Sequence, residues 1–253
     1  MEIELKENER IDDLEFKGLK IIQNKNGFCF GMDAVLLSDF AKEIKNNSNV
    51  IDLGTGTGIL PILLSGKTNN CIFTGVEIQK DVADMANRSV ELNKLEDKVK
   101  IQNIDILKLK DFYDRKSFDV IVTNPPYKKI ETGISNDQEK KNISKNEITA
   151  SLEEFISISS YLLKDYGEFY MVNRPNRLVD IFNIMRKEKI EPKKIKMISP
   201  NENKKPNLIL IKGVKNGKPF LEVEKDLIVY KKDGSYTDEI LKIYNKKWLK
   251  YKF

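Results

Sequence analysis

The feature that most constrains the fold is an apolar run that ends in a glycine turn and continues as an apolar helix. Asn49-Val-Ile-Asp-Leu53 has the composition of a buried strand, Gly54-Thr-Gly-Thr-Gly58 follows it, and residues 59–64 favour a helix. This order lets the backbone approach a nucleotide-like ligand and directs helix N–H groups toward it. The chain is therefore expected to be an α/β protein with a ligand site at this turn.

The spacing of the glycines narrows the class of ligand. A dinucleotide-binding turn requires Gly-x-Gly-x-x-Gly, and counting from Gly54 its third glycine would stand at Ile59. Here the third glycine is Gly58, and Asp52 lies just before the turn. A nicotinamide-dependent dehydrogenase is therefore disfavoured.

Two further segments predict strands that lead to acidic residues. The strand Cys71–Glu77 ends about twenty residues after the glycine turn, where a carboxylate can bind both hydroxyls of a ribose. The alternative for Glu77 is a surface charge or a cap for the helix that begins near Lys80. The strand Val99–Asn103 leads to Asp105, which is placed to accept a hydrogen bond from an adenine amine.

A fourth predicted strand, Phe118–Thr123, runs into Asn124-Pro125-Pro126-Tyr127. Neither proline has a backbone N–H, so the Asn124 side-chain oxygen and the Pro125 carbonyl are offered as acceptors. Two hydrogen bonds accepted from one amine would keep its lone pair available for attack, while Tyr127 stacks on a flat substrate. The alternative is a Pro-Pro loop with an exposed Asn cap and a packing tyrosine.

The segments around these motifs complete an alternating pattern of helices and strands. Residues 1–25 predict a charged lead-in with a strand-like piece near 19–22, and Asp33 is expected to cap an amphipathic helix. A loop over the site is expected at 128–145. Further elements are expected as helices at 151–163 and 176–187, strands at 167–172, 194–198 and 207–213, and a lysine-rich helix near the end. Trp248, Tyr251 and Phe253 would pack the tail or stack on bases.

The composition excludes several chemistries. The 253 residues include no histidine, which rules out an imidazole base or a histidine zinc ligand. The two cysteines, Cys29 and Cys71, have no metal-binding spacing and favour reduced thiols. No signal peptide or membrane-spanning run is recognised. We expect a cytoplasmic protein that binds neither a metal nor a membrane.

Positive charge is concentrated in one part of the chain. From Arg174 to Lys218 there are thirteen Lys or Arg against four Asp or Glu, a balance of +9, so a net charge of +5 leaves −4 for the remainder. This asymmetry predicts a phosphate-binding surface. The alternative is a lysine bias produced by an AT-rich genome.

These motifs occur together in one known superfamily. Asp52–Gly58, Glu77, Asp105 and Asn124–Tyr127 resemble, in order and spacing, the class I S-adenosylmethionine-dependent methyltransferases. The chain is further similar to bacterial tRNA adenine-N6 methyltransferases that modify the adenosine next to the anticodon of a valine tRNA. That likeness is carried by Gly27–Leu37, Asn146–Thr149, Val172–Pro175, Ile190–Pro192, Leu208–Gly213 and Tyr236–Glu239. Asn146 and Asn173 depart from it, because relatives often carry histidine there.

The resemblance implies a Rossmann-like fold, with a seven-stranded, mostly parallel sheet and helices on both faces. One domain is expected over 1–253, with a lead-in and helix at 1–45 and a core at 46–253 whose C-terminal half is basic. The implied donor is S-adenosylmethionine and the implied partner is tRNA. The donor would contact Gly31, Asp33, Asp52, Gly54, Thr55, Gly56, Glu77, Ile78, Asp105, Ile106 and Asn124. Direct methyl transfer would rely on Asn124, Pro125, Pro126 and Tyr127.

Other functions share parts of this pattern. Methyltransferases of a glutamine amide in release factors carry the same tetrapeptide but have a helical N-terminal domain, and only about fifty residues precede the glycine turn here. DNA adenine methyltransferases need a target-recognition insertion, for which the chain has no room. Modification of an rRNA base and a non-catalytic RNA-binding role on the same fold stay open. So does the oligomeric state, with a monomer favoured.

Overall fold

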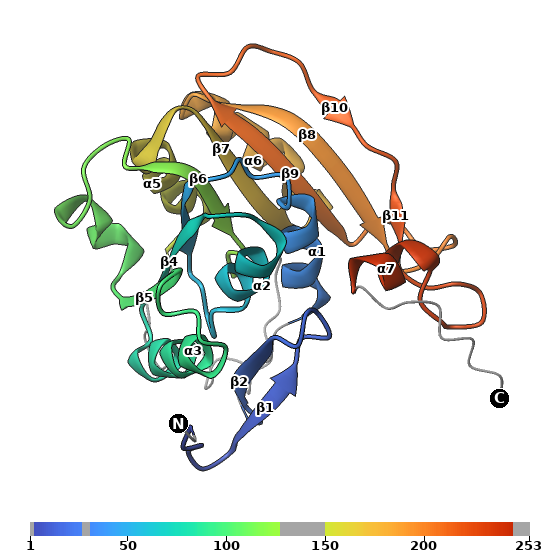
Figure 1. Cartoon of the computed structure of the whole chain (residues 1–253). Coiled ribbons are helices and arrows are strands. Elements are labelled where there is room, and N and C mark those ends of the chain that lie inside the picture. Colours follow the sequence, from blue (N-terminus) through green and yellow to red (C-terminus); the bar gives the residue numbers. More distant parts are fainter. Residues whose placement is uncertain (1–2, 27–30, 127–149, 245–253) are drawn as a thin grey trace, which may run out of the picture.

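A mixed β-sheet runs through the protein, whose computed structural model describes residues 3–26, 31–126 and 150–244 (Figure 1). Within these residues the order is β10-β8-β9-β7-β6-β3-β4-β5, with β11 also paired to β8. Every neighbouring pair is parallel except those that involve β9. The strands are β3 (Asn49–Leu53), β4 (Ile72–Glu77), β5 (Val99–Asn103), β6 (Phe118–Thr123), β7 (Leu163–Asn173), β8 (Ile190–Ser199), β9 (Leu208–Lys215), β10 (Glu222–Val223) and β11 (Leu227–Ile228).

The expected α/β class and mostly parallel sheet are confirmed, and the strand count is larger than expected. Seven strands are long, as expected, and the two-residue strands β10 and β11 bring the described sheet to nine. Both short strands pair with β8, which would otherwise be the edge of the sheet. A two-residue strand has too little hydrophobic pattern to be predicted from sequence.

Helices cover both faces of the sheet, as expected (Figure 1). Alternate side chains of the strands point to opposite faces, so Val50 belongs to one hydrophobic core and Ile51 to the other. The first core contains residues of α1 (Met32–Phe40), α2 (Ile59–Lys67), α3 (Lys80–Leu92) and α7 (Asp238–Ile243). The second contains residues of α5 (Leu152–Leu162), α6 (Leu178–Lys187) and the 3₁₀ helix η1 (Ile106–Asp111). A second 3₁₀ helix, η2 (Pro175–Arg177), precedes α6.

The starts of two helices show how local sequence sets the boundaries. α5 begins with a capping box, in which Ser151 accepts from the Glu154 N–H and Glu154 accepts from the Ser151 N–H. The expectation that Asp33 caps α1 is wrong, because the cap is Gly31 and makes no side-chain hydrogen bond. The helix therefore begins two residues earlier than a cap at Asp33 would place it. Asp33 therefore lies in the first turn, where its negative charge interacts favourably with the positive end of the helix dipole.

The lead-in forms a hairpin of β1 (Glu9–Asp13) and β2 (Lys20–Asn24) that packs against α3. The Ile22 N–H donates to the Ser89 hydroxyl at 2.9 Å. Arg88 of α3 donates to both oxygens of Glu9, at 2.7 and 2.6 Å. The strand-like piece expected near 19–22 is thus confirmed, and this buried ion pair fastens its hairpin to the rest of the protein.

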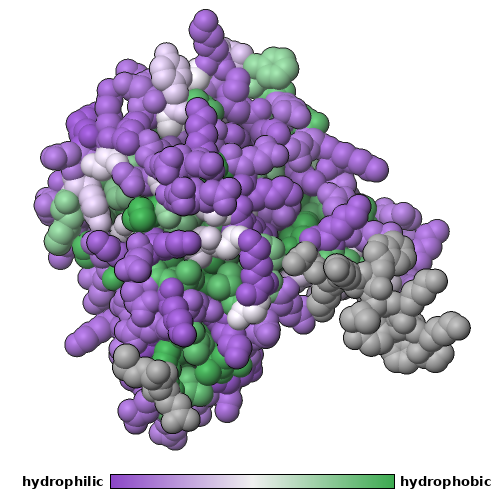
Figure 2. Space-filling view, viewed as in Figure 1, coloured by the Kyte–Doolittle hydropathy of each residue, from purple (hydrophilic) through white to green (hydrophobic). Residues whose placement is uncertain are grey.

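Several expectations fall on residues that the structure does not describe. They concern the loop 128–145, Asn146–Thr149, Cys29 and the aromatic residues Trp248, Tyr251 and Phe253. Among the described residues, no helix is long and apolar enough to cross a bilayer. The face seen in Figure 2 is mainly hydrophilic, with hydrophobic side chains emerging in small groups.

The Glu9–Arg88 ion pair generates a prediction about stability. Its hydrogen bond to Arg88 holds the pKa of Glu9 below its usual value, so the pair stabilises the protein above pH about 4.5 and this contribution is lost as the pH falls. We expect Glu9→Ala to lower the free energy of unfolding by about 2 kcal/mol at pH 7, because Arg88 loses two charged hydrogen bonds and keeps only Asp84 as a carboxylate partner. Urea unfolding measures this.

The matched control is Lys6→Ala, which removes the exposed ion pair with Asp84 on the same helix. Exposed pairs contribute little, so this variant should lose less than about 1 kcal/mol. Equal losses in the two variants would contradict the assignment of Glu9–Arg88 as the fastening contact.

Candidate functional site

Strand register brings the motifs together at one edge of the sheet. Leu53 pairs with both Thr123 and Val76, so Asn124, the glycine turn and Glu77 lie side by side at the carboxyl ends of β6, β3 and β4. Glu77 in turn pairs with Asn103 at the end of β5. Because neighbouring strands are about 4.8 Å apart, the four strand ends span roughly 15 Å. An edge of this kind is where open α/β sheets bind ligands.

The glycine turn is built from backbone conformations that favour glycine. Gly54, Gly56 and Gly58 have φ values of 73°, 58° and 84°, all in the left-handed region. The N–H groups of Gly54 and Thr55 both donate to the Val76 carbonyl, at 3.0 and 2.9 Å. These bonds hold the turn against the end of β4.

Glu77 is buried and bonded, with 7% of its surface exposed. One carboxylate oxygen accepts from the Gly56 N–H at 3.0 Å and the other from the Gln79 N–H at 2.9 Å. Two ordered donors fix the carboxylate, yet each oxygen keeps capacity for a further hydrogen bond. Glu77 is therefore not a surface charge, and it links the glycine turn to the start of α3.

The neighbouring strand end carries Asn103, a residue that sequence reasoning missed. Its side-chain N–H₂ donates to the carbonyls of Glu77 at 2.9 Å and Ile78 at 2.8 Å. The only available signal was a polar residue at the end of a strand that aligns with Glu77. Asp105 caps η1 by accepting from the Leu107 N–H at 2.9 Å. Ile78 is 41% exposed, whereas Ile106 is buried.

Asp52 and Thr55 lie beneath the glycine turn as buried polar groups. They are 2% and 4% exposed, and among the described residues neither Asp52 oxygen nor the Thr55 hydroxyl has a hydrogen-bond partner of ordinary geometry. Burial raises the pKa of Asp52 to about 7, the nearby Thr55 hydroxyl opposes the rise, and the Glu77 charge adds to it. Unsatisfied buried polar atoms cost stability, so these atoms fit a site completed by a ligand's polar groups.

Space for the Thr55 side chain exists because residue 75 is glycine. A Cβ at Gly75 would lie 2.9 Å from the Thr55 hydroxyl oxygen and 2.8 Å from Ile101. Gly75 pairs with Asp52 across the sheet. This glycine, which sequence reasoning did not single out, shapes the floor of the site.

The Asn124–Pro126 turn leaves β6 at the level of the glycine turn. Asn124 is half-buried, Pro125 is buried and Pro126 is exposed. Just before them, the Thr123 hydroxyl donates to the Leu53 carbonyl at 2.9 Å, which fixes the two strand ends together. Tyr127 lies outside the described residues.

The remaining expected residues lie at the start of α1 and the end of β7. Gly31 and Asp33 stand at the first turn of α1, which packs against α2 (Figure 1). Asn173, where histidine is common in the resembled family, is 6% exposed and accepts from the Arg174 N–H at 2.8 Å. Its amide therefore has a local structural role.

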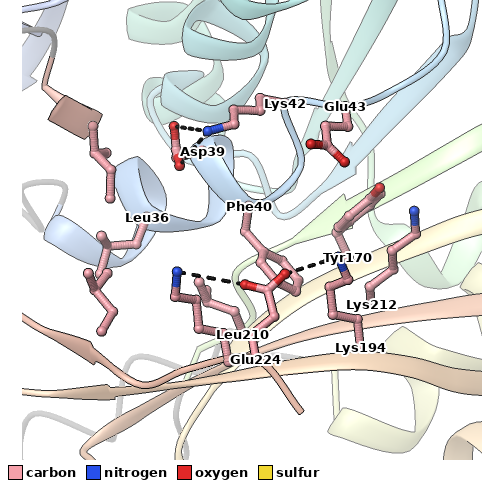
Figure 3. Close-up of a pocket in the computed structure, with 13 residues that line it drawn as sticks. Leu36, Asp39, Phe40, Lys42, Glu43, Tyr170, Lys194, Leu210, Lys212 and Glu224 are labelled. Carbon is pink, nitrogen blue, oxygen red and sulfur yellow. Dashed lines mark hydrogen bonds and ion pairs between the residues drawn. The ribbon is translucent and has the colours of Figure 1, made fainter. Parts of the chain in front are cut away.

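A pocket of about 170 Å³ lies away from the glycine turn, between α1 and strands β7, β8 and β9 (Figure 3). Phe40, Tyr170 and Leu210 form apolar parts of its wall. Its rim mixes lysines with acids, and Figure 3 shows Glu224 reaching two lysine side chains. None of the expected site residues lines this pocket.

The sequence matches a family described as the methyltransferase small domain over residues 30–189. A protein from Porphyromonas gingivalis named tRNA1(Val) (adenine(37)-N6)-methyltransferase is 26% identical over 242 residues, which cover 92% of this chain and 93% of that protein. A protein of the same name from Haemophilus influenzae is 25% identical and covers 93% and 98% of the two chains.

Solved structures share the fold at low sequence identity. A predicted O-methyltransferase, protein Atu636 from Agrobacterium tumefaciens, has a TM-score of 0.67 and 19% identity, covering 85% of this chain and 96% of its own. P. horikoshii TYW2, solved in complex with MeSAdo, has a TM-score of 0.58 and 16% identity over 84% and 73% of the chains. These likenesses confirm the Rossmann-like methyltransferase fold.

The raised pKa of Asp52 generates a prediction about pH. In the unfolded chain this carboxyl has a pKa near 3.8, whereas in the ligand-free native protein it is about 7. The native state therefore holds the proton more tightly, and stability falls as the pH rises from about 4 to about 7. We expect Asp52→Asn to remove this decline, with a difference on the order of 4 kcal/mol above pH 7.

Urea unfolding of both proteins at pH 5, 6, 7 and 8, without ligand, measures the effect. The gain from Asp52→Asn should grow with pH until about 7 and then level off. Parallel stability curves for the two proteins would show that Asp52 is not held protonated by its surroundings.

Proposed function

The chain belongs to the methyltransferase small domain family, and on this premise we propose that it methylates the exocyclic N6 amine of an adenosine in tRNA, with S-adenosylmethionine as the donor. The observation that carries the proposal is the register of β6, β3 and β4, which sets Asn124 and Pro125 beside the glycine turn and Glu77. A donor held at the glycine turn would then be the neighbour of an amine held at residues Asn124–Pro126, which we call the Asn-Pro corner.

The residues at the strand ends suit the parts of the donor. Glu77 has acceptor capacity left for two ribose hydroxyls. Asp105, just beyond the next strand end, would accept from the adenine amine, and Ile78 and Ile106 would offer apolar contacts to the donor. The left-handed Gly54 and Gly56 let the backbone approach the ligand. Asp52 and Thr55 offer unsatisfied polar atoms at the turn, and Gly31 and Asp33 would close the methionine end.

The chain's own residues have a positioning task. The donor supplies a methyl group already activated by a positively charged sulfur. The Asn124 side-chain oxygen and the Pro125 carbonyl accept hydrogen bonds from the target amine and keep its lone pair directed at the methyl carbon. Pro126 keeps the corner free of competing N–H donors. Tyr127 would stack on the adenine, which has to leave its base stack to reach this edge.

The choice of tRNA as substrate is supported by the names of relatives that align over nine-tenths of the chain. Those names specify an adenine at position 37 of a valine tRNA. We therefore propose the adenosine next to the anticodon as the target. The reaction needs no imidazole, in keeping with a chain that contains no histidine.

The acceptor role of Asn124 is tested by Asn124→Ala. We expect the rate of methyl transfer to an unmodified valine tRNA transcript to fall by at least about 100-fold, because one of the two acceptors for the amine is lost. S-adenosylhomocysteine binding, measured by calorimetry, should change less than about threefold. Turnover within a few-fold of the wild type would refute the role, and methylation of a release-factor glutamine instead of tRNA would refute the substrate.

The ribose-binding role of Glu77 is tested by Glu77→Gln, which keeps the shape of the side chain, removes its charge and replaces one of the two oxygens that accept from the Gly56 and Gln79 N–H groups. Hydrogen bonds to a charged group contribute about 1.5–3 kcal/mol, so S-adenosylhomocysteine should bind about 10–100-fold more weakly. Glu91→Gln, an exposed change of equal charge on α3, is the control. Unchanged affinity in Glu77→Gln would place the ribose elsewhere.

A further inference from the structure

The lysines of the basic segment 174–218 fall into groups that the sequence does not distinguish. Lys194 lies 3.0 Å from Glu224, Lys196 lies 2.9 Å from Glu239, and Lys212 lies 2.7 Å from Glu168. These lysines line the pocket of Figure 3, where acids from other segments neutralise them. The middle of β8 and β9 is therefore a poor phosphate-binding surface.

The turn between β8 and β9, residues 200–207, lies at the same edge of the sheet as the candidate site. Asn173 at the end of β7 pairs with Ile209 near the start of β9. The Arg174 guanidinium donates to the Asn207 carbonyl at 3.0 Å, which fastens the turn to the segment that follows β7. β7 is the neighbour of β6, which ends at Thr123 just before Asn124. From β6 the turn is thus two to three strand spacings away, about 10–15 Å.

Lys204 and Lys205 stand on this turn as exposed cations without an acidic partner among the described residues. Their backbone is held in place, because the Lys204 N–H donates to the Asn201 carbonyl at 3.1 Å. The Asn201 side chain also accepts from the Asn203 N–H at 3.0 Å. The exposed Glu202 of the same turn forms an ion pair with neither lysine, so the fixed turn presents two lysine charges and one carboxylate next to the candidate site.

We propose that Lys204 and Lys205 bind RNA phosphates beside the target nucleotide, with Arg174 as the residue that positions their turn. This inference rests on the proposed function. A separation of about 10–15 Å from Asn124 corresponds to a few nucleotides along a strand, so phosphates that flank an adenine at the Asn-Pro corner would reach the turn. Phosphate contacts would position the RNA strand on the protein, while the Asn-Pro corner would recognise the adenine base.

Lys189 and Lys218 provide a matched comparison within the same segment. Both are exposed and have no acidic partner among the described residues, but they flank the opposite ends of β8 and β9, where Ile190 pairs with Lys215. A ten-residue strand at about 3.3 Å per residue puts them roughly 30 Å from the turn. If only total charge mattered, removing either pair of lysines would weaken tRNA binding equally. The proposal instead predicts a larger loss for Lys204 and Lys205.

The experiment compares Lys204→Gln/Lys205→Gln with Lys189→Gln/Lys218→Gln in the full chain, because each variant removes two positive charges. Binding of an unmodified valine tRNA transcript is followed by fluorescence anisotropy at several salt concentrations. Losing two phosphate contacts should lower the slope of log affinity against log salt by about 1.4–1.8. We expect at least about tenfold weaker binding for the turn variant at 0.1 M salt and less than about twofold for the control.

Kinetics separate a binding role from a fold defect. The turn variant should raise the KM for tRNA, with kcat and S-adenosylhomocysteine affinity within about twofold of the wild type. Equal effects in the two variants, or a larger effect in Lys189→Gln/Lys218→Gln, would overturn the inference while the wild type still methylates tRNA. If only the Lys204→Gln/Lys205→Gln variant binds tRNA more weakly, but the wild-type protein transfers no methyl group to tRNA, the proposed function is overturned and the inference about the turn stands.

Discussion

The register of β3 with its two neighbours is the constraint on which the site depends. Because Leu53 pairs with Thr123 on one side and Val76 on the other, the Asn-Pro corner, the glycine turn and Glu77 leave the sheet at one level. A shift of β3 by one residue would turn Asp52 toward the opposite face. The alternating cores oppose such a shift, since Val50 and Ile51 pack against different sets of helices.

Polar groups at this edge are held by backbone more than by other side chains. Glu77 is fixed by two N–H donors, and Asn103 ties the carbonyls of residues 77 and 78. Asp52 is the exception, since burial raises its pKa to about 7 and no described residue satisfies its oxygens. Preorganisation and an unsatisfied group at the same place are typical of sites that are completed by a ligand.

Tertiary structure divides the basic segment into parts with different environments. Lysines in the middle of β8 and β9 meet Glu168, Glu224 and Glu239, which lie outside the segment. The turn that carries Lys204 and Lys205 meets no such acids among the described residues. A surplus of charge along a sequence therefore indicates a phosphate-binding role without locating it, because neutralising partners come from distant segments.

The sequence by itself determined the α/β class, the long strands, the glycine turn and the order of the motifs, because hydrophobic period and glycine spacing are local properties. It misplaced the cap of α1 by two residues and gave no sign of β10 and β11, because short or shifted boundaries leave almost no periodic signal. Only the tertiary structure decided that Asn103 donates to the carbonyl of Glu77 and that Gly75 makes room for Thr55. It also decided which lysines of the basic segment form ion pairs with acidic residues. Those outcomes depend on strand pairing and on contacts between residues far apart in the chain, which no local pattern specifies.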